Sequence, residues 1–173
     1  MKILLTLVCF IFSTSAWANA PVGTFKVVKG EVSVVHSDGK KEKARIGVKV
    51  FPKDIIETFK DARGKIVMMD KNVINLSPDT KLEIQDYTFK PDENKKSVLL
   101  NLMYGKVRPQ VNQKYDEKEN TFRVKTSAAV AGVRGTDFIV SFQNKQSQII
   151  TFHGLVSVGA GVDSNNQILN SVS

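Results

Sequence analysis

Cysteine is almost absent from this sequence: the only one is Cys9, inside an apolar run at the amino terminus. A disulfide needs two cysteines, and a thiolate metal site or a cysteine nucleophile needs at least one in the folded part of the chain. If the amino-terminal run is removed after export, the rest of the chain can form none of these. We therefore expect no disulfide, no thiolate metal site and no cysteine-based catalysis.

Histidine is nearly as rare, with only His36 and His153. Neither has a second metal-binding side chain at a useful spacing, whereas a zinc site needs three or four converging ligands. We interpret both as surface or turn residues. The sequence also has no Gly-x-Ser-x-Gly elbow, no phosphate-binding loop and no paired carboxylates expected on one face. We predict no catalytic residues, no metal ligands and no cofactor, and hence a protein that is not an enzyme.

Long apolar runs are missing except at the amino terminus. Lys2 gives a positive start, residues 3–12 are apolar with one interruption, and residues 13–20 are mostly small and polar. These are the three regions of a secretory signal peptide. The apolar run is too short to span a bilayer, which takes roughly 20 residues. The sequence therefore predicts an exported bacterial protein, periplasmic or secreted, with an uncleaved anchor as the alternative.

The small residues before the expected mature chain place the cleavage site. Ala16-Trp17-Ala18 fits a small-x-small pattern, so we predict a signal peptide at residues 1–18, ahead of the alternative of cleavage after Ala20. No transmembrane span is expected after cleavage. Removal of Lys2 would lower the formal net charge by one, from +8 to +7.

A basic chain of this kind usually suggests a nucleic-acid partner, because clustered lysine and arginine displace phosphate counterions. Export redirects that inference: outside the cytoplasm the anionic partners are envelope polymers, lipid head groups or an acidic protein face. The two basic runs, Lys40–Lys43 and Asn94–Lys96, are interpreted as solvated loops, because a charge run alone carries no geometry. We expect no nucleic-acid partner.

Helical periodicity is also lacking, since no window of a dozen residues keeps an apolar i, i+3, i+4, i+7 pattern. About a dozen short alternating or β-branched runs, cut by turn residues, predict an all-β fold in a single domain. Pro109 suits an edge strand, and residues 90–96 read as a charged loop. Three runs continue through a glycine to a valine two residues later, at Gly30, Gly105 and Gly154. Such a strand kinks or bulges at its glycine, as the corner of a barrel, sandwich or β-solenoid requires.

The stretch Thr126–Val140 is the most distinctive part of the chain. Small residues run from Ser127 to Ala131, and two glycines bracket a valine and an arginine before an apolar run resumes. Arg134 could be presented to an anionic ligand. We favour a structural role instead, in which it bonds neighbouring carbonyls or pairs with Asp137 to hold the turn, because a desolvated arginine in a packed corner demands a partner.

The same stretch resembles the signature of the FecR domain family, in which a Val-x-Thr-Pro-type strand leads into Ala-x-x-Arg-Gly-Thr-x-Phe-x-Val. The matching motif residues, which we interpret as structural, are Thr126, Ala131, Gly132, Arg134, Gly135, Thr136, Asp137 and Phe138. Other matches are the Asp54-Ile-x-x-Thr58 start, the Leu-x-Pro-x-Thr80-x-Leu step and the Gly-x-Val strands. Two departures are Lys53, where the family usually has glycine, and Ser127, where proline is common.

The resemblance implies a β-rich FecR fold and sets the expected domains. They are a signal peptide at 1–18, leading β-strands of the same domain at 19–52, a FecR-like domain at 53–158 and a polar carboxy-terminal tail at 159–173. Well-known family members cross the inner membrane and control a sigma factor. The present sequence shows no cytoplasmic segment, so direct anti-sigma action is not expected.

Two functional hypotheses follow from the resemblance and the charge. The first is a non-enzymatic periplasmic module that binds or signals in the cell envelope, with an envelope protein as its partner. The alternative is a carrier or scaffold for an anionic envelope polymer or lipid, such as peptidoglycan or lipopolysaccharide.

Overall fold

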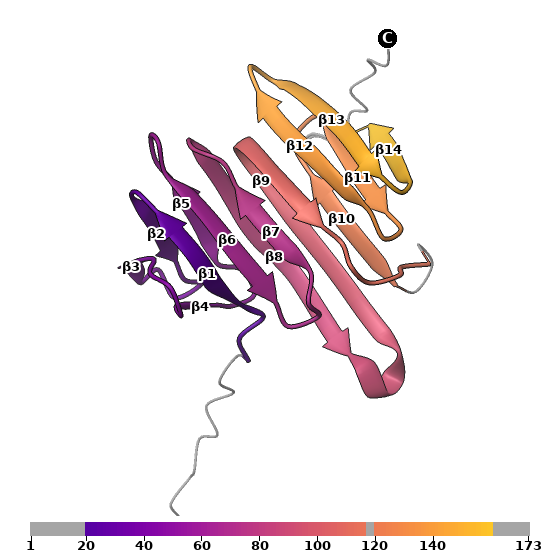
Figure 1. The fold of residues 1–173 in the computed structure, drawn as a ribbon, viewed down its shortest axis with the longest axis horizontal. Coiled ribbons are helices and arrows are strands. Elements are labelled where there is room, and N and C mark those ends of the chain that lie inside the picture. Colours follow the sequence, from indigo (N-terminus) through magenta and orange to yellow (C-terminus); the bar gives the residue numbers. More distant parts are fainter. Residues whose placement is uncertain (1–19, 117–119, 161–173) are drawn as a thin grey trace, which may run out of the picture.

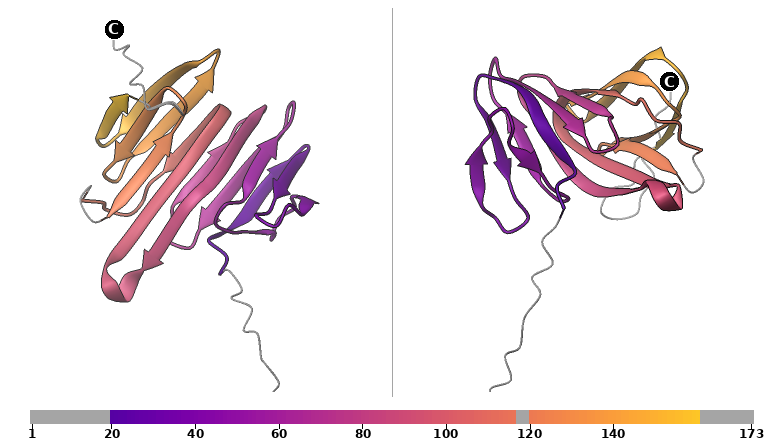
Figure 2. Two further views of the ribbon diagram at one scale, coloured as in Figure 1. Left: turned by 180° about the vertical axis from the view of Figure 1, so that it is seen from behind. Right: turned by 60° about the horizontal axis from the view of Figure 1, so that its bottom comes forward.

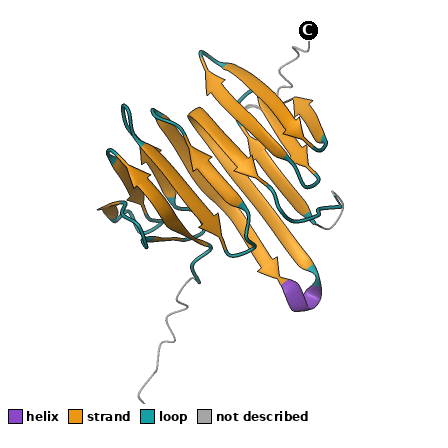
Figure 3. Cartoon of the chain, in the orientation of Figure 1, coloured by secondary structure: helices purple, strands orange, loops and turns teal. Residues whose placement is uncertain are grey.

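The computed structural model describes residues 20–116 and 120–160, most of which lie in β-strands (Figures 1 and 3). Within these residues the only helix is one 3-10 turn, η1 (Pro91–Glu93), and none is long and apolar enough to cross a membrane. The predicted all-β fold of many short strands is confirmed. The described strands are β1 (Gly23–Lys29), β2 (Val32–Val35), β3 (Lys41–Lys43), β4 (Lys49–Val50), β5 (Ile55–Thr58), β6 (Arg63–Met68), β7 (Val73–Leu76), β8 (Thr80–Lys90), β9 (Lys95–Gln110), β10 (Thr121–Lys125), β11 (Ala129–Val133), β12 (Asp137–Gln143), β13 (Gln146–His153) and β14 (Val156–Ala160).

The strands form two layers that share β9. The first layer, called sheet A below, runs in the order β4, β1, β6, β7, second half of β9, β12 and β13. The second, sheet B, runs β3, β2, β5, β8, first half of β9, β10, β11 and β14. Because β9 passes from sheet B into sheet A, the layers are one continuous sheet that curls into an open half-barrel (Figure 2).

The repeated glycines lie where the chain passes from one layer to the other. Gly30 joins β1 to β2, Gly105 lies within β9, and Gly154 joins β13 to β14, all with positive φ of 74°, 93° and 93°. Residues that have a Cβ rarely adopt a positive φ, whereas glycine does so readily. The space is also closed, because a Cβ on Gly105 would lie 2.4 Å from the carbonyl oxygen of Asp79. The predicted kinks at glycine are therefore confirmed as corners of the half-barrel.

The core fills the space between the two layers. In strands such as β6 and β7 every second residue is buried, so period-two alternation supplies one inward face per layer. Phe25 from sheet A and Phe122 from sheet B are almost completely buried, and Phe138 of the motif stretch joins them. Aliphatic residues such as Ile66 and Leu100 occupy most of the remaining space. The outward residues of both layers are left to face solvent.

The leading strands pair directly with strands from the middle of the chain. β1 is antiparallel to β6, with Phe25 opposite Ile66, and β2 is antiparallel to β5, with Val34 opposite Ile56. These four residues are all buried in the common core. The predicted signal peptide at 1–18, and all of the predicted tail beyond Ala160, lie outside the described residues.

Two expectations about local structure are wrong. Pro109 does not lie in an edge strand, because β9 has β7 on one side and β12 on the other. The ladder with β12 pairs Val107 and Gln110 but skips the two residues between them, so the missing proline N–H falls in a gap of the ladder. Residues 90–96 are not an extended loop: Lys90 is paired with Lys95, and η1 closes the hairpin between β8 and β9.

Candidate functional site

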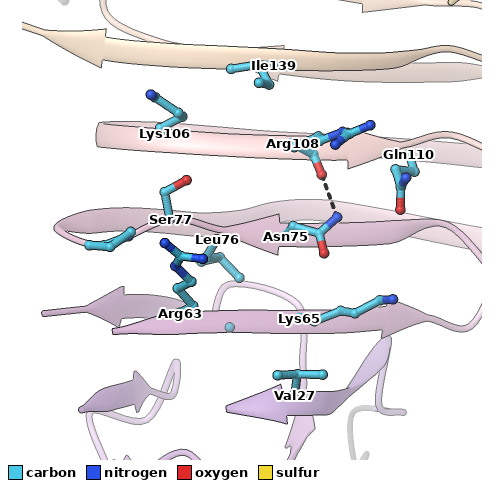
Figure 4. A pocket seen from close by; sticks show the side chains of 12 residues that line it. Val27, Arg63, Lys65, Asn75, Leu76, Ser77, Lys106, Arg108, Gln110 and Ile139 are labelled. Carbon is cyan, nitrogen blue, oxygen red and sulfur yellow. Dashed lines mark hydrogen bonds between the residues drawn. The ribbon is translucent and has the colours of Figure 1, made fainter. Parts of the chain in front are cut away.

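An open groove crosses the exposed face of sheet A and has a volume of ≈ 580 Å³ (Figure 4). Five strands that lie side by side contribute to it: β1, β6, β7, β9 and β12. Cationic, amide and small side chains predominate, and no carboxylate lines it. The lining residues are Val27, Arg63, Gly64, Lys65, Asn75, Leu76, Ser77, Pro78, Lys106, Arg108, Gln110 and Ile139.

Strand periodicity places the cations of the groove on one face. Arg63 and Lys65 are two residues apart in β6, and Lys106 and Arg108 are two residues apart in β9. Residues two apart in a strand point to the same side of the sheet. The residues between them, Gly64 and Val107, are buried. Each strand therefore presents two cations outward while its alternate residues face the core.

The register lines these residues up across the sheet. Lys65 is opposite Val27 on β1 and Asn75 on β7, and Asn75 is opposite Arg108 on β9. The amide Nδ2 of Asn75 donates a hydrogen bond of 3.2 Å to the backbone carbonyl of Arg108, drawn as the dashed line in Figure 4. In the next row Lys29 is opposite Arg63. Neighbouring strands lie about 4.8 Å apart, so the rows form a closely spaced grid of cations.

The charge of this face is one-sided. With β9 counted from Gly105, the strands of sheet A carry one acidic residue, Asp137, and seven basic ones: Lys26, Lys29, Lys49, Arg63, Lys65, Lys106 and Arg108. Asp137 is itself bound by Arg108 in a two-pronged ion pair, with distances of 2.8 Å from Nε to Oδ1 and 2.7 Å from Nη2 to Oδ2. The hydrogen bond from Arg108 lowers the pKa of Asp137 below its usual value.

The other cations of the groove differ from Arg108 in this respect. Among the described residues, no carboxylate forms an ion pair with Arg63, Lys65 or Lys106. Like charges that face each other across a sheet repel, and an external anion removes that repulsion. The groove can thus bind anions through charge and through the polar side chains of Ser77 and Gln110.

The metal-binding residue types do not gather in the described part of the chain. No group of three or more histidine, cysteine, aspartate or glutamate side chains within it could hold a metal ion. The prediction that this chain has no metal ligands and no catalytic residues stays a prediction.

Three threonines of the resemblance motifs lie where the chain passes between the layers. Thr58, Thr80 and Thr136 are all buried. The hydroxyl of Thr58 donates to the carbonyl of Ser77 at 2.6 Å, and that of Thr136 donates to the carbonyl of Leu155 at 2.9 Å. Thr80 Oγ1 accepts from the N–H of Lys106 at 3.0 Å. Each hydroxyl satisfies a backbone group at a corner, where the regular ladder is interrupted.

Thr126, at the start of the motif stretch, holds the turn between β10 and β11. Its Oγ1 accepts hydrogen bonds from the N–H groups of Ala128 and Ala129, at 3.1 and 3.0 Å, and lies 2.6 Å from Oγ of Ser147. After the turn, Ala131 is buried, and Gly132 lies opposite Ser157 of β14. This part of the motif is therefore occupied by backbone contacts and by packing.

Arg134 bonds a backbone carbonyl, which is one of the two arrangements expected of it: its Nε donates to the carbonyl of Tyr115 at 3.3 Å. Its side chain is exposed, however, rather than desolvated. The expected alternative of a pair with Asp137 is wrong, because the carboxylate of Asp137 points to Arg108 on β9. Gly135, between them, has a φ of +65°, so the chain turns sharply and the two side chains diverge.

Comparison with known proteins assigns the family. The family model described as "FecR protein" matches residues 54–157, which include the corner threonines and the whole motif stretch. The chain belongs to the FecR family. Membership places it among signalling-related proteins, and the sequence resemblance is confirmed. No curated protein matches the chain.

Two solved structures resemble the chain of this FecR protein more distantly. Both are crystal structures of a candidate anti-sigma factor from Parabacteroides distasonis ATCC 8503. In each case the identity is 16%, the TM-score is 0.43, and the match covers 66% of this chain and 57% of that one.

The FecR match begins at Asp54, which belongs to a polar cluster that the sequence did not reveal. His36 is not a simple turn residue: its Nδ1 lies 2.9 Å from Oδ1 of Asp54, and its Nε2 lies 3.2 Å from Oε1 of Glu42. Asp54 is fully buried and also accepts the N–H of Phe51. Burial lowers the pKa of His36, but the hydrogen bonds to the two carboxylates outweigh that effect and raise it overall. Burial raises the pKa of Asp54.

The groove itself was not found from the sequence, which drew attention to other basic residues. Lys41–Lys43 form the edge strand β3 and Lys95 begins β9, so these two runs lie in strands rather than in loops. The available signal was the basic-x-basic spacing at Arg63-Gly-Lys65 and at Lys106-Val-Arg108. In a strand that spacing predicts two cations on one face, whereas consecutive lysines alternate between faces.

Proposed function

We propose that this FecR protein is a non-enzymatic, exported module that binds or signals in the bacterial cell envelope. The amino-terminal sequence supports export, and membership in the FecR family supports a signalling-related role. Periplasmic location and lack of catalysis are parts of the proposal.

The observation that carries the proposal is the set of unpaired cations in the groove on sheet A. Arg63, Lys65 and Lys106 have no carboxylate partner among the described residues, although a chain with 17 acidic residues could supply one. A surface of one charge sign speeds encounter with an oppositely charged partner. We therefore assign the partner surface to the groove, and an acidic face on an envelope protein fits it.

Crosslinking from the groove tests this assignment. A photoreactive amino acid replaces Val27, which lines the groove and is exposed, and a control carries it at Asp86, which is exposed on β8 in sheet B. After irradiation of cells, the periplasmic fraction is separated and crosslinked species are identified by mass spectrometry. We expect a discrete partner from position 27 and none from position 86.

Two results would contradict the proposal. One is protein found in the cytoplasmic fraction with Met1 retained. The other is equal crosslinking from positions 27 and 86, which would show that the groove is not the preferred contact surface.

A second candidate function is favoured by the same excess of charge. A carrier or scaffold for an anionic envelope polymer or lipid needs several cations side by side, and sheet A provides them. Peptidoglycan or lipopolysaccharide that stays bound through a native purification would support the carrier. Pure protein with neither of them would favour the protein partner.

A further inference from the structure

The outer face of sheet A also exposes apolar side chains beside its cations. Phe152 and Ile150 on β13 are 56% and 44% exposed, and Val27 on β1 is 47% exposed. Ile150 is paired with Ile139, which lines the groove, so the two point to the same side of the sheet. Apolar side chains therefore share this face with the cations, on β13 at one edge of the sheet and on β1 among the basic strands.

Cations and apolar groups are in direct contact at one point of this face. The guanidinium of Arg108 lies 4.8 Å from the centre of the Phe152 ring, within the range of a cation–π interaction. Strand alternation directs the ring to this face, and the contact keeps it beside a cation. Moving an exposed phenylalanine ring from water into an apolar medium lowers its free energy.

We propose that this face docks on the surface of an anionic lipid bilayer. The lysines and arginines would lie at the level of the lipid phosphates, and Phe152, Ile150 and Val27 would enter the boundary between head groups and acyl chains. The proposal rests on the second candidate function, binding of an anionic envelope lipid, and it competes with the protein partner for the same face.

The arrangement of the cations favours a surface over a single soluble chain. Lys29, Arg63 and Lys106 come from three strands of one row, and Lys65 and Arg108 come from the row beside it. A bilayer presents phosphates in two dimensions and meets both rows at once. A linear polymer that followed one row would leave the other row unpaired and would leave the apolar side chains in water.

The opposite face of the molecule has a less one-sided charge. With β9 counted up to Tyr104, the strands of sheet B carry four acidic residues, Glu42, Glu57, Glu83 and Asp86, among eight basic ones. Tyr104 donates to Glu57, and Lys81 forms an ion pair with the same carboxylate. The two-to-one ratio of basic to acidic residues in sheet B, against seven to one in sheet A, weakens the attraction of this face to an anionic surface. Docking is thus expected mainly through sheet A, and sheet B supplies matched controls.

Co-sedimentation of the mature chain with vesicles tests the proposal. One set of vesicles contains phosphatidylglycerol in phosphatidylcholine, and the other contains phosphatidylcholine alone. The charge variant combines Arg63→Glu with Lys65→Glu, and its control combines Arg123→Glu with Lys125→Glu, which are also two residues apart but lie on β10 of sheet B. The apolar variant combines Ile150→Ser with Phe152→Ser, and its control is Val158→Ser, which is exposed on β14.

We expect the wild type to bind the phosphatidylglycerol vesicles and to bind the neutral ones about tenfold less tightly. The charge variant should lose about tenfold in affinity and the apolar variant several-fold, whereas both controls should keep wild-type binding. Circular dichroism and thermal unfolding confirm that each variant is folded. A folded double serine variant that binds as tightly as wild type would overturn the proposal, because docking would then not use the apolar side chains of this face.

Absence of binding to either kind of vesicle would also overturn the proposal. The proposed function has a separate readout, since the crosslink from position 27 to an envelope protein does not depend on vesicle binding. A chain that crosslinks to a periplasmic partner but ignores vesicles therefore refutes lipid docking alone.

Discussion

Arg108 of β9 holds Asp137, the first residue of β12, through two hydrogen bonds of 2.8 and 2.7 Å. The contact joins the groove to the family motif, because Arg108 lines the groove and Asp137 belongs to the motif stretch. It also bridges the point where the ladder between β9 and β12 skips Arg108 and Pro109. A side-chain pair thus replaces backbone bonds that proline cannot make.

Replacement of Asp137 by asparagine tests this bridge. Because the pKa of Asp137 is lowered in the folded state, the ionised carboxylate stabilises the fold above its unfolded-state pKa and loses that effect as the pH falls through the folded-state value. We expect Asp137→Asn to lower the free energy of unfolding by on the order of 1 kcal/mol at neutral pH. Urea denaturation at several pH values should show the difference shrinking toward acid.

The exposed pair Lys90–Glu93 is the matched control for that prediction. Both side chains are more than half exposed, so Glu93→Gln should change the unfolding free energy by only a few tenths of a kcal/mol. If Asp137→Asn and Glu93→Gln were equally mild at neutral pH, the bridge between β9 and β12 would have no special role.

Glycine substitutions should separate backbone strain from steric overlap. Gly105→Ala places a Cβ 2.4 Å from both the Asp79 carbonyl oxygen and Thr80 Oγ1, whereas a Cβ at Gly135 meets nothing closer than 3.5 Å. Both glycines have positive φ. We expect Gly105→Ala to destabilise most, Gly135→Val to destabilise by about 1 kcal/mol or more, and Lys95→Ala to have little effect. Chemical denaturation gives the order.

Asparagine at position 135 provides the control for the glycine series. Asparagine tolerates positive φ better than a β-branched residue, so Gly135→Asn should be milder than Gly135→Val. Equal destabilisation by Gly135→Val and Lys95→Ala would show that the turn does not require its positive φ.

Loss of one hydroxyl should test how the segment after β9 is held. Tyr115 OH donates to Asp70 at 3.0 Å and accepts from Asn72 at 2.9 Å, and all three residues are buried. Tyr115→Phe leaves these partners short of a hydrogen bond, which costs about 1–3 kcal/mol. Thermal unfolding measures the loss. Tyr104→Phe, at an exposed tyrosine that donates to Glu57, should change the stability much less.

The features that could be predicted from the sequence are local ones. A glycine that interrupts a strand at Gly105 predicts a kink because positive φ is a property of one residue. Alternating apolar and polar residues predicted short strands with one buried face, and β10 is an example, with Phe122 and Val124 buried. The family motif was recognisable because its residues are consecutive. None of these inferences requires knowledge of which strand lies next to which.

The candidate site depends on pairing between distant strands, and that is why it escaped prediction. Lys65 and Arg108 lie in one row across the sheet, with Asn75 of β7 between them. Only the register of the three strands shows this. For the same reason Pro109 read as an edge residue, and Asp137 was matched with Arg134 three residues away instead of Arg108, 29 residues away. Sequence proximity was a poor guide to charge partners.

The pH dependence of stability should report on His36. Its pKa is raised in the folded state by hydrogen bonds to Asp54 and Glu42. A raised pKa means that the protonated imidazole stabilises the fold below its unfolded value of 6.5, and that this contribution is lost as the pH rises through the folded value. We expect His36→Gln to destabilise more at about pH 6 than at about pH 9.

Urea midpoints of the wild type and of His36→Gln at the two pH values measure the effect, with His153→Gln, at the exposed end of β13, as the control. A gap between wild type and His36→Gln that is the same at both pH values would mean that the charge on His36 does not stabilise the fold.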